Sequence, residues 1–151
     1  KAIGGCEGYL VPGGFGSRGW EGKILTAHYC RTNKIPYFGL CLGMQVMLVE
    51  FARYAFGLKQ AHSTEVDPNT PDPVVSMLAE QKQLQNLGGT MRLGAYPCEL
   101  KSGSLAEQAY GKRLVWERHR HRYEFNNEYK KAFEEKGMLF SGKLERGELC
   151  E

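Results

Sequence analysis

The sequence places one cysteine where a nucleophile could act. Cys41 has a glycine two residues away on each side, at Gly39 and Gly43. The apolar residues 37–40 before it predict a buried strand, and the apolar residues 46–56 after it predict a largely buried helix. A reactive residue between small residues at a sharp strand-to-helix turn is typical of a nucleophile elbow, here with Cys in place of Ser.

Such a position suits nucleophilic catalysis for two reasons. The positive end of the helix dipole favours the thiolate form of Cys41, which is the reactive form. The N–H of Leu42, at the start of the helix, is available to hydrogen-bond a developing oxyanion. A free cysteine is often only a buried core residue, but the paired glycines favour the interpretation of Cys41 as a nucleophile.

The segments before Cys41 predict the framework that would position it. Residues 8–11 predict a short strand, residues 12–19 form a glycine-rich loop, and residues 20–31 predict a helix. Followed by the strand and helix around Cys41, this order is typical of an α/β domain with a parallel sheet. We therefore expect an α/β fold with a mostly parallel central sheet flanked by helices.

The glycine-rich loop contains a G-x-G-x-x-G pattern from Gly14 to Gly19, which resembles a dinucleotide fingerprint. That fingerprint needs an acidic residue about 20 positions further on, and residues 33–42 contain none. We reject nucleotide binding on this ground. Because glycine tolerates the backbone angles that an oxyanion donor often needs, Gly14 is a candidate for a second donor.

The rest of the chain predicts shorter elements and one unusual basic tract. Residues 117–124 would, as a strand, place Arg118, Arg120 and Arg122 on one face. From the pattern alone we rank a solvated surface first, RNA binding second and the gripping of a carboxylate third. The other expected elements are a polar loop at 61–68, an apolar piece at 74–78, a mobile surface loop at 80–86, a turn and strand at 87–94, a helix at 104–110, an amphipathic helix around 129–133 and a last strand starting at 138–141.

The length and composition of the chain limit the classes of protein to which it can belong. With 151 residues, 42% hydrophobic and 25% charged, the chain is typical of one globular domain. Its formal net charge of +3 does not by itself indicate nucleic acid or membrane as a partner. Five widely spaced cysteines and four histidines show no spacing typical of a metal site or a disulfide framework, so we expect no metal and a cytoplasmic location.

Five segments occur in a fixed order along the chain: residues 11–19, 39–45, 63–65, 88–94 and 117–124. Together they resemble the class I (triad) glutamine amidotransferase domain of the CTP synthase family, and the resemblance spans nearly the whole chain. The elbow alone would indicate only the wider amidotransferase superfamily.

The resemblance implies hydrolysis of L-glutamine to glutamate and ammonia, with Cys41 forming a glutamyl thioester. Gly14 and Leu42 would supply the oxyanion N–H groups. Gln45 and Glu65 would hold the head of glutamine, with Glu65 facing its α-ammonium, and Arg122 would pair with its α-carboxylate. This moves carboxylate binding from third to first place for the basic tract.

The resemblance also implies partners outside this chain. Ammonia would pass to a synthetase domain of the same polypeptide, which aminates UTP to CTP with ATP and Mg²⁺, so residues 1–151 would need no cofactor of their own. The full-length protein would be a homo-oligomer, a tetramer, with neither nucleic acid nor a membrane as partner.

Two departures from the family qualify this interpretation. His62 stands where the family usually has Asn, and the sequence contains no His-Pro-Glu segment, which carries the family's catalytic His and Glu. We therefore expect residues 1–151 to be part of a glutamine amidotransferase domain, without its first strands and its general base. The open alternatives are another class I amidotransferase, a γ-glutamyl hydrolase, or a non-catalytic RNA-binding domain that uses residues 118–122.

Overall fold

The computed structural model describes residues 4–77, 92–144 and 149–150. The chain forms two compact units, Lys1–Ser76 and Met77–Glu151, and each is described by itself. The expected loop at 80–86 and the turn at 87–91 lie outside the described residues. None of the described helices combines the length and the apolar character that a bilayer crossing needs.

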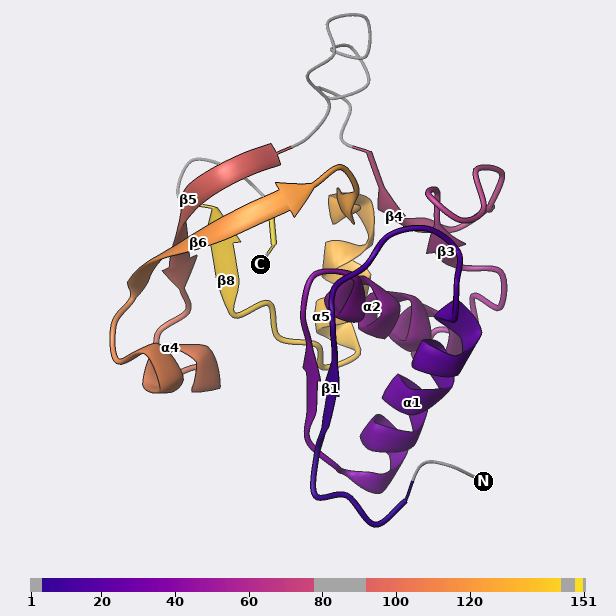
Figure 1. The fold of residues 1–151 in the computed structure, drawn as a ribbon, viewed down its shortest axis with the longest axis horizontal. Coiled ribbons are helices and arrows are strands. Elements are labelled where there is room, and N and C mark those ends of the chain that lie inside the picture. Colours follow the sequence, from indigo (N-terminus) through magenta and orange to yellow (C-terminus); the bar gives the residue numbers. More distant parts are fainter. Residues whose placement is uncertain (1–3, 78–91, 145–148, 151) are drawn as a thin grey trace, which may run out of the picture. The chain divides into compact units, whose positions relative to one another are not determined.

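The first unit has the strand and helix order that the sequence predicts (Figure 1). Strand β1 (Tyr9–Val11), helix α1 (Trp20–Asn33), strand β2 (Tyr37–Gly39) and helix α2 (Leu42–Ala55) follow one another. The two strands pair in parallel, with Tyr9 opposite Tyr37 and Val11 opposite Gly39. Strands β3 (His62–Ser63) and β4 (Pro73–Ser76) form a second parallel pair. The α/β fold with parallel strands is thus confirmed.

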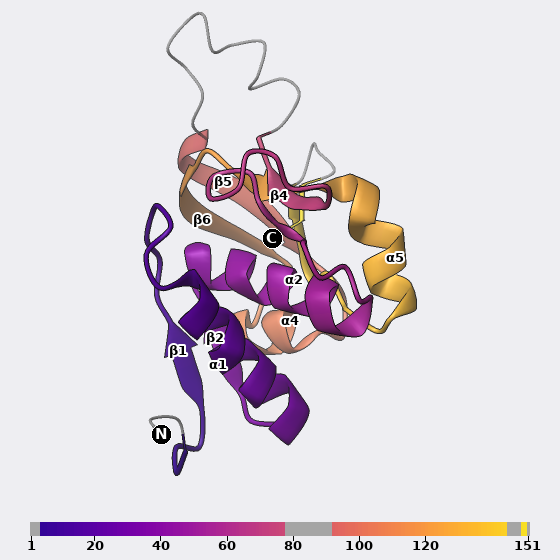
Figure 2. The same ribbon diagram turned by 90° about the vertical axis from the view of Figure 1, so that its right-hand side faces the viewer.

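Helices α1 and α2 lie on the same side of the β1–β2 pair, as Figure 1 and Figure 2 show. Their buried faces supply the core of this unit, because the apolar side chains recur at helical spacing. A polar cluster also joins the two helices: the buried carboxylate of Glu50 accepts hydrogen bonds from the Arg31 guanidinium and contacts His28 Nδ1 at 2.8 Å. The buried apolar residues of the two helices include Ile24, Ala27, Cys30, Val46 and Val49.

The prediction that residues 37–40 form a buried strand is wrong in its burial. Strand β2 forms, but Phe38 is 61% exposed and Leu40 is 42% exposed. The reason is that the helices cover one face of the β1–β2 pair, and side chains alternate between the two faces of a strand. Leu10 lies opposite Phe38 in the register and is exposed on the same face.

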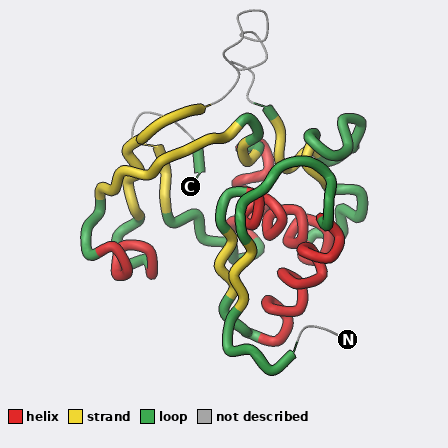
Figure 3. The backbone as a smooth tube through the Cα atoms, viewed as in Figure 1, coloured by secondary structure: helices red, strands yellow, loops and turns green. Residues whose placement is uncertain are grey.

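The second unit contains an antiparallel sheet in the order β6-β5-β8, which the sequence did not predict (Figure 3). It is built from β5 (Arg92–Leu100), β6 (Leu114–His121) and β8 (Gly142–Leu144). Along the chain, α4 (Leu105–Tyr110) lies between β5 and β6, and β7 (Glu124–Phe125), η2 (Asn127–Tyr129) and α5 (Lys130–Glu135) lie between β6 and β8. Cys98, Leu100 and Val115 form a small buried cluster in this unit.

The helix expected at 104–110 is confirmed as α4: Ser104 caps its start by accepting from the Glu107 N–H, and Gly111 ends it with a positive φ. The last strand, however, begins at Gly142 and not at residues 138–141. Met138 instead completes the end of α5, since its N–H donates to Phe133 O at 3.0 Å while Gly137 takes φ 92°. The expected polar loop at 61–68 also contains the buried strand β3.

Candidate active site

The backbone at Cys41 makes the sharp turn that the elbow prediction requires. Strand β2 ends at Gly39 and helix α2 begins at Leu42, so the turn takes two residues. Cys41 occupies the N-cap position with φ 53° and ψ −106°, a region that residues with a side chain rarely adopt. A strained backbone of this kind costs about 1–3 kcal/mol and is found preferentially at functional sites.

Glycine is required on both sides of this turn for steric reasons. A Cβ on Gly39 would lie 2.5 Å from the Gly43 carbonyl carbon. A Cβ on Gly43 would overlap the Val11 carbonyl oxygen. The strand before Cys41, the helix after it and strand β1 therefore approach one another as backbones, and any side chain at these two glycines would push them apart.

The glycine-rich loop lies directly against the elbow. Leu40 N–H donates to Val11 O at 2.9 Å, which fixes the end of β1 beside the start of the turn. A Cβ on Gly13 would meet the Cys41 Cβ at 3.3 Å, and a Cβ on Gly14 would meet the Leu42 side chain at 3.2 Å. The structure thus brings together three of the predicted site residues, Gly14, Cys41 and Leu42.

This arrangement can stabilise a negative oxygen next to the sulfur of Cys41. Leu42 is the first residue of α2, so its N–H has no acceptor within the helix. The Cys41 carbonyl accepts from the Met44 and Gln45 N–H groups at 3.0 and 3.2 Å, which holds the thiol-bearing residue at the helix N-terminus. An N–H from the elbow and an N–H from the loop are the usual pair of donors for a tetrahedral intermediate of acyl transfer.

Tyr37 is a supporting residue that sequence reasoning missed. Its hydroxyl donates to the Gly43 carbonyl oxygen at 2.8 Å, so it links the start of β2 to the first turn of α2. Burial raises the pKa of the Tyr37 phenol well above its ordinary value, so the hydroxyl keeps the proton that it donates. The sequence shows only a tyrosine six residues before a glycine of the turn. This spacing alone does not predict a hydrogen bond between the two residues.

Glu65 lies in the loop after β3 and reaches the glycine-rich loop. Its Oε1 accepts a hydrogen bond from Gly16 N–H at 2.8 Å, although the two residues are 49 positions apart. Gly16 O in turn accepts from the Trp20 indole N–H at 2.9 Å. Gln45 is buried in α2, one turn after Cys41. The predicted contacts of Gln45 and Glu65 with a substrate remain predictions.

Arg122 belongs to the second unit, where it is exposed in the turn between β6 and β7. Glu124 anchors this turn from inside: its buried carboxylate accepts from Arg92 Nε at 2.9 Å and lies 3.5 Å from His121 Nδ1. Burial tends to raise the pKa of Glu124, but the adjacent His121 side chain and the charge of Arg92 outweigh it, so this pKa lies below its ordinary value. The pairing of Arg122 with a substrate of Cys41 remains a prediction.

The basic tract has the predicted alternation. Arg118 and Arg120 are exposed on β6, whereas His119 between them is buried.

The two histidines of the first unit both have side-chain contacts: His28 with Glu50, and His62 with the backbone N–H of Ser63. Among the described residues, no group of three or more His, Cys, Asp or Glu side chains is placed to hold a metal ion.

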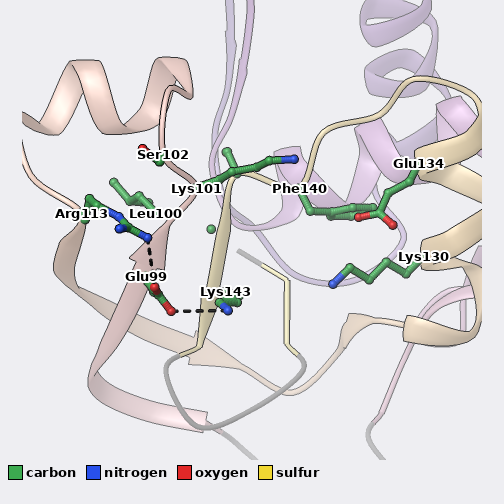
Figure 4. Close-up of a pocket in the computed structure, with 11 residues that line it drawn as sticks. Glu99, Leu100, Lys101, Ser102, Arg113, Lys130, Glu134, Phe140 and Lys143 are labelled. Atoms are coloured by element: carbon green, nitrogen blue, oxygen red, sulfur yellow. Dashed lines mark hydrogen bonds and ion pairs between the residues drawn. The ribbon is translucent and has the colours of Figure 1, made fainter.

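A pocket of about 280 Å³ lies in the second unit, between α5 and strands β5 and β8 (Figure 4). Glu99 on its wall pairs with Arg113 at 3.3 Å and with Lys143 at 3.4 Å. Lys101 and Lys130 point into it beside the ring of Phe140. None of the predicted site residues lines this pocket.

The fold and the elbow define the class of this protein. The chain belongs to the family Glutamine amidotransferase class-I, whose model matches residues 2–151. It is 63% identical over all 151 residues to a CTP synthase of Protochlamydia amoebophila and 57% identical over 151 residues to one of Bacillus velezensis. The chain spans 28% of the length of each of these two relatives.

A solved structure supports the same relationship. It is described as Trypanosoma brucei CTPS, the glutaminase domain with bound acivicin. The match has a TM-score of 0.86 and 39% sequence identity, and it covers 91% of this chain and 52% of that chain. The family and the fold that the sequence predicted are thereby confirmed.

Proposed function

We propose that this chain is the glutamine-hydrolysing part of a CTP synthase. The observation that carries the proposal is the strained backbone of Cys41 at the N-terminus of α2, with the glycine-rich loop against its side chain. The match to CTP synthases over the whole chain supports CTP synthase as the enzyme that this site would serve.

In the proposed reaction the Cys41 thiolate attacks the side-chain carboxamide carbon of L-glutamine. A carbon–sulfur bond forms, and the carbonyl π electrons move to the oxygen, which accepts hydrogen bonds from the Leu42 and Gly14 N–H groups. Collapse of this intermediate breaks the carbon–nitrogen bond and releases ammonia, once the nitrogen has received a proton. Water then hydrolyses the glutamyl thioester, which yields glutamate and regenerates Cys41.

The substrate would be held by its α-amino-acid head. Glu65 would face the α-ammonium, because it is an acidic side chain held beside the glycine-rich loop. Gln45 on α2 would also hold the head of glutamine. Arg122 would pair with the α-carboxylate through two parallel hydrogen bonds. The proton transfers need a general base, which the family carries in a His-Pro-Glu segment that these 151 residues do not contain.

The other partners of the proposal lie outside this chain. Ammonia would pass to a synthetase domain of the same polypeptide, where ATP and Mg²⁺ serve the amination of UTP. Residues 1–151 would need no cofactor of their own. The full-length protein would be a cytoplasmic homotetramer.

Two nitrogen sources test the proposal in the full-length protein. CTP formation from UTP and ATP is measured with glutamine and, separately, with free ammonia. Cys41→Ser should lower the glutamine-dependent rate by about three or more powers of ten, because the nucleophile is lost. The ammonia-dependent rate should stay near that of the unmodified enzyme, and Cys6→Ser should change neither rate.

The same assay separates the alternatives. A Cys41→Ser enzyme that still uses glutamine would overturn the role of Cys41. A protein that hydrolyses γ-glutamyl peptides as fast as glutamine and forms no CTP would instead be a γ-glutamyl hydrolase.

A further inference from the structure

His62 lies in a closed series of contacts that joins the glycine-rich loop to Glu65. The rings of His62 and Trp20 pack with their centroids 5.0 Å apart, and the Trp20 indole N–H donates to Gly16 O at 2.9 Å. On the other side, His62 Nδ1 accepts from Ser63 N–H at 2.8 Å. Ser63 Oγ accepts from Glu65 N–H at 3.2 Å, and Glu65 Oε1 accepts from Gly16 N–H at 2.8 Å, which closes the series.

The contacts of His62 specify which nitrogen of its ring carries the proton. Because Nδ1 accepts a hydrogen bond, the neutral ring carries its proton on Nε2. His62 is 9% exposed and Ser63 is fully buried, so the Ser63 N–H has no access to water. If Nδ1 were protonated, it could no longer accept this hydrogen bond, and a buried N–H would lose its partner.

Charged groups of three segments face His62. Arg53 of α2 donates from Nε to Ala61 O at 2.8 Å and pairs through Nη1 with Glu21 of α1 at 2.9 Å. Asp67 lies in the loop after β3. Burial, followed by the charge of Arg53, lowers the pKa of His62, while Glu21 and Asp67 oppose this shift. His62 is therefore neutral at neutral pH and becomes protonated only in acid.

We propose that His62 is a positioning residue for glutamine: its neutral ring holds Trp20 and Ser63, and these fix Gly16 and Glu65 at the substrate head. The inference deepens the proposed function and rests on it. His62 does not contact the substrate in this account. It acts by keeping the carboxylate of Glu65 and the loop that carries Gly14 in one mutual arrangement.

The experiment compares two variants of the full-length enzyme, with glutamine and ammonia as nitrogen sources. His62→Asn keeps an acceptor where Nδ1 stands but does not titrate, because the amide oxygen takes the place of the ring nitrogen. His62→Phe keeps an aromatic ring against Trp20 and loses the acceptor. At about pH 8, His62→Phe should raise the glutamine KM roughly five- to tenfold with kcat nearly unchanged, whereas His62→Asn should stay within about threefold of the unmodified enzyme.

The pH dependence gives the second readout. As the pH falls from neutral through the lowered pKa of His62, the glutamine KM of the unmodified enzyme should rise, because His62 becomes protonated. In His62→Asn this rise should disappear. A His62→Phe enzyme with an unchanged KM, or a His62→Asn enzyme with the same rise, would overturn the proposal. A merely structural role would lower the ammonia-dependent rate as well.

A double-mutant cycle tests whether the effect runs through Trp20. Trp20→Phe keeps a ring against His62 but removes the N–H that holds Gly16, so it should also raise the glutamine KM. The effects of Trp20→Phe and His62→Phe should be less than additive, since both release the same loop. Additive effects would contradict the coupling. If the unmodified enzyme used ammonia and not glutamine, the proposed function itself would fail, which is a different outcome.

Discussion

The α-carbon of Gly43 faces the carbonyl oxygen of Val11 at a separation that leaves no room for a side chain. This contact joins the end of β1 to the first turn of α2, while Leu40 N–H donates to the same oxygen at 2.9 Å. The Val11 carbonyl thus determines how closely the elbow approaches the glycine-rich loop. The position of Cys41 depends on it, because Cys41 lies between Leu40 and Gly43.

Gly43→Ala should therefore damage the elbow. The added methyl group must displace backbone and not a flexible side chain, so we expect a loss of local stability of about 2 kcal/mol or more. Hydrogen exchange of α2 in the full-length enzyme measures this loss, and glutamine-dependent activity should fall with it while ammonia-dependent activity is kept.

Gly22→Ala is the matched control for this substitution. Gly22 lies within α1, where an added Cβ would meet no side chain and no other segment of the described chain within 4 Å, and its φ is not positive. The change should be neutral or stabilise α1 by up to about 1 kcal/mol, because alanine favours helices. Equal exchange rates in the Gly43→Ala enzyme and the unmodified enzyme would show that the contact with Val11 is not needed.

Arg122→Ala should affect glutamine use alone. Removal of a charge-assisted pair with the α-carboxylate costs roughly 1.5–3 kcal/mol, which corresponds to a loss in kcat/KM of about tenfold or more. Arg122→Lys should restore only part of it, because an ammonium cannot reproduce the planar fork of a guanidinium. The rates with glutamine and with ammonia are measured on the same preparations.

Arg118→Ala is the control here, because Arg118 is exposed on the neighbouring strand β6. It should leave both rates unchanged. If RNA binding were the function of the tract, both substitutions would weaken RNA affinity in a salt-dependent way and leave glutamine kinetics alone. An equal loss with both nitrogen sources would mean that Arg122 supports the fold and not the substrate.

The buried pair of Arg92 and Glu124 should determine how the second unit responds to substitution and to acid. Arg92→Met leaves the Glu124 carboxylate buried without its charged partner, which costs about 3 kcal/mol or more in local stability. Hydrogen exchange of β5 and of residues 122–125 should accelerate accordingly. Arg113→Met, which breaks an exposed pair with Glu99, should cost less than about 1 kcal/mol.

The pH dependence of this pair has a defined sign. Because the folded-state pKa of Glu124 is lowered, its contribution to stability is complete above the ordinary carboxyl pKa and is lost as pH falls through the lowered value. Protection of residues 122–125 should therefore decrease in acid in the unmodified enzyme. In a Glu124→Gln enzyme, this part of the acid dependence should be absent, and its persistence would contradict the assignment.

The sequence predicts the elements around Cys41 because their signals are local. The apolar runs and the glycines at 39 and 43 each act within a few positions, and the structure has β2 and α2 where the sequence predicts them. The exposure of Phe38 was not predicted, because it depends on distant elements. An apolar run predicts a strand but does not specify which of its faces other elements cover.

The contacts that organise the candidate site were also beyond sequence reasoning. The bond of Gly16 to Glu65 spans 49 positions, and neither residue type predicts the other. The packing of Trp20 on His62 and the bond of Tyr37 to Gly43 likewise depend on tertiary structure. The antiparallel sheet of the second unit was missed because β5 and β6 contain glycine, proline and charged residues, which weaken the strand pattern.

The most direct test of the account is the site at which an electrophilic glutamine analogue reacts with the full-length enzyme. Peptide mapping should place the label on Cys41, and excess glutamine should protect it. Cys6 is the matched control, because it is exposed and should react with a general thiol reagent but not with the analogue. Label on Cys6, or on the buried Cys30, Cys98 or Cys150 with Cys41 unmodified, would contradict the assignment of Cys41 as the nucleophile.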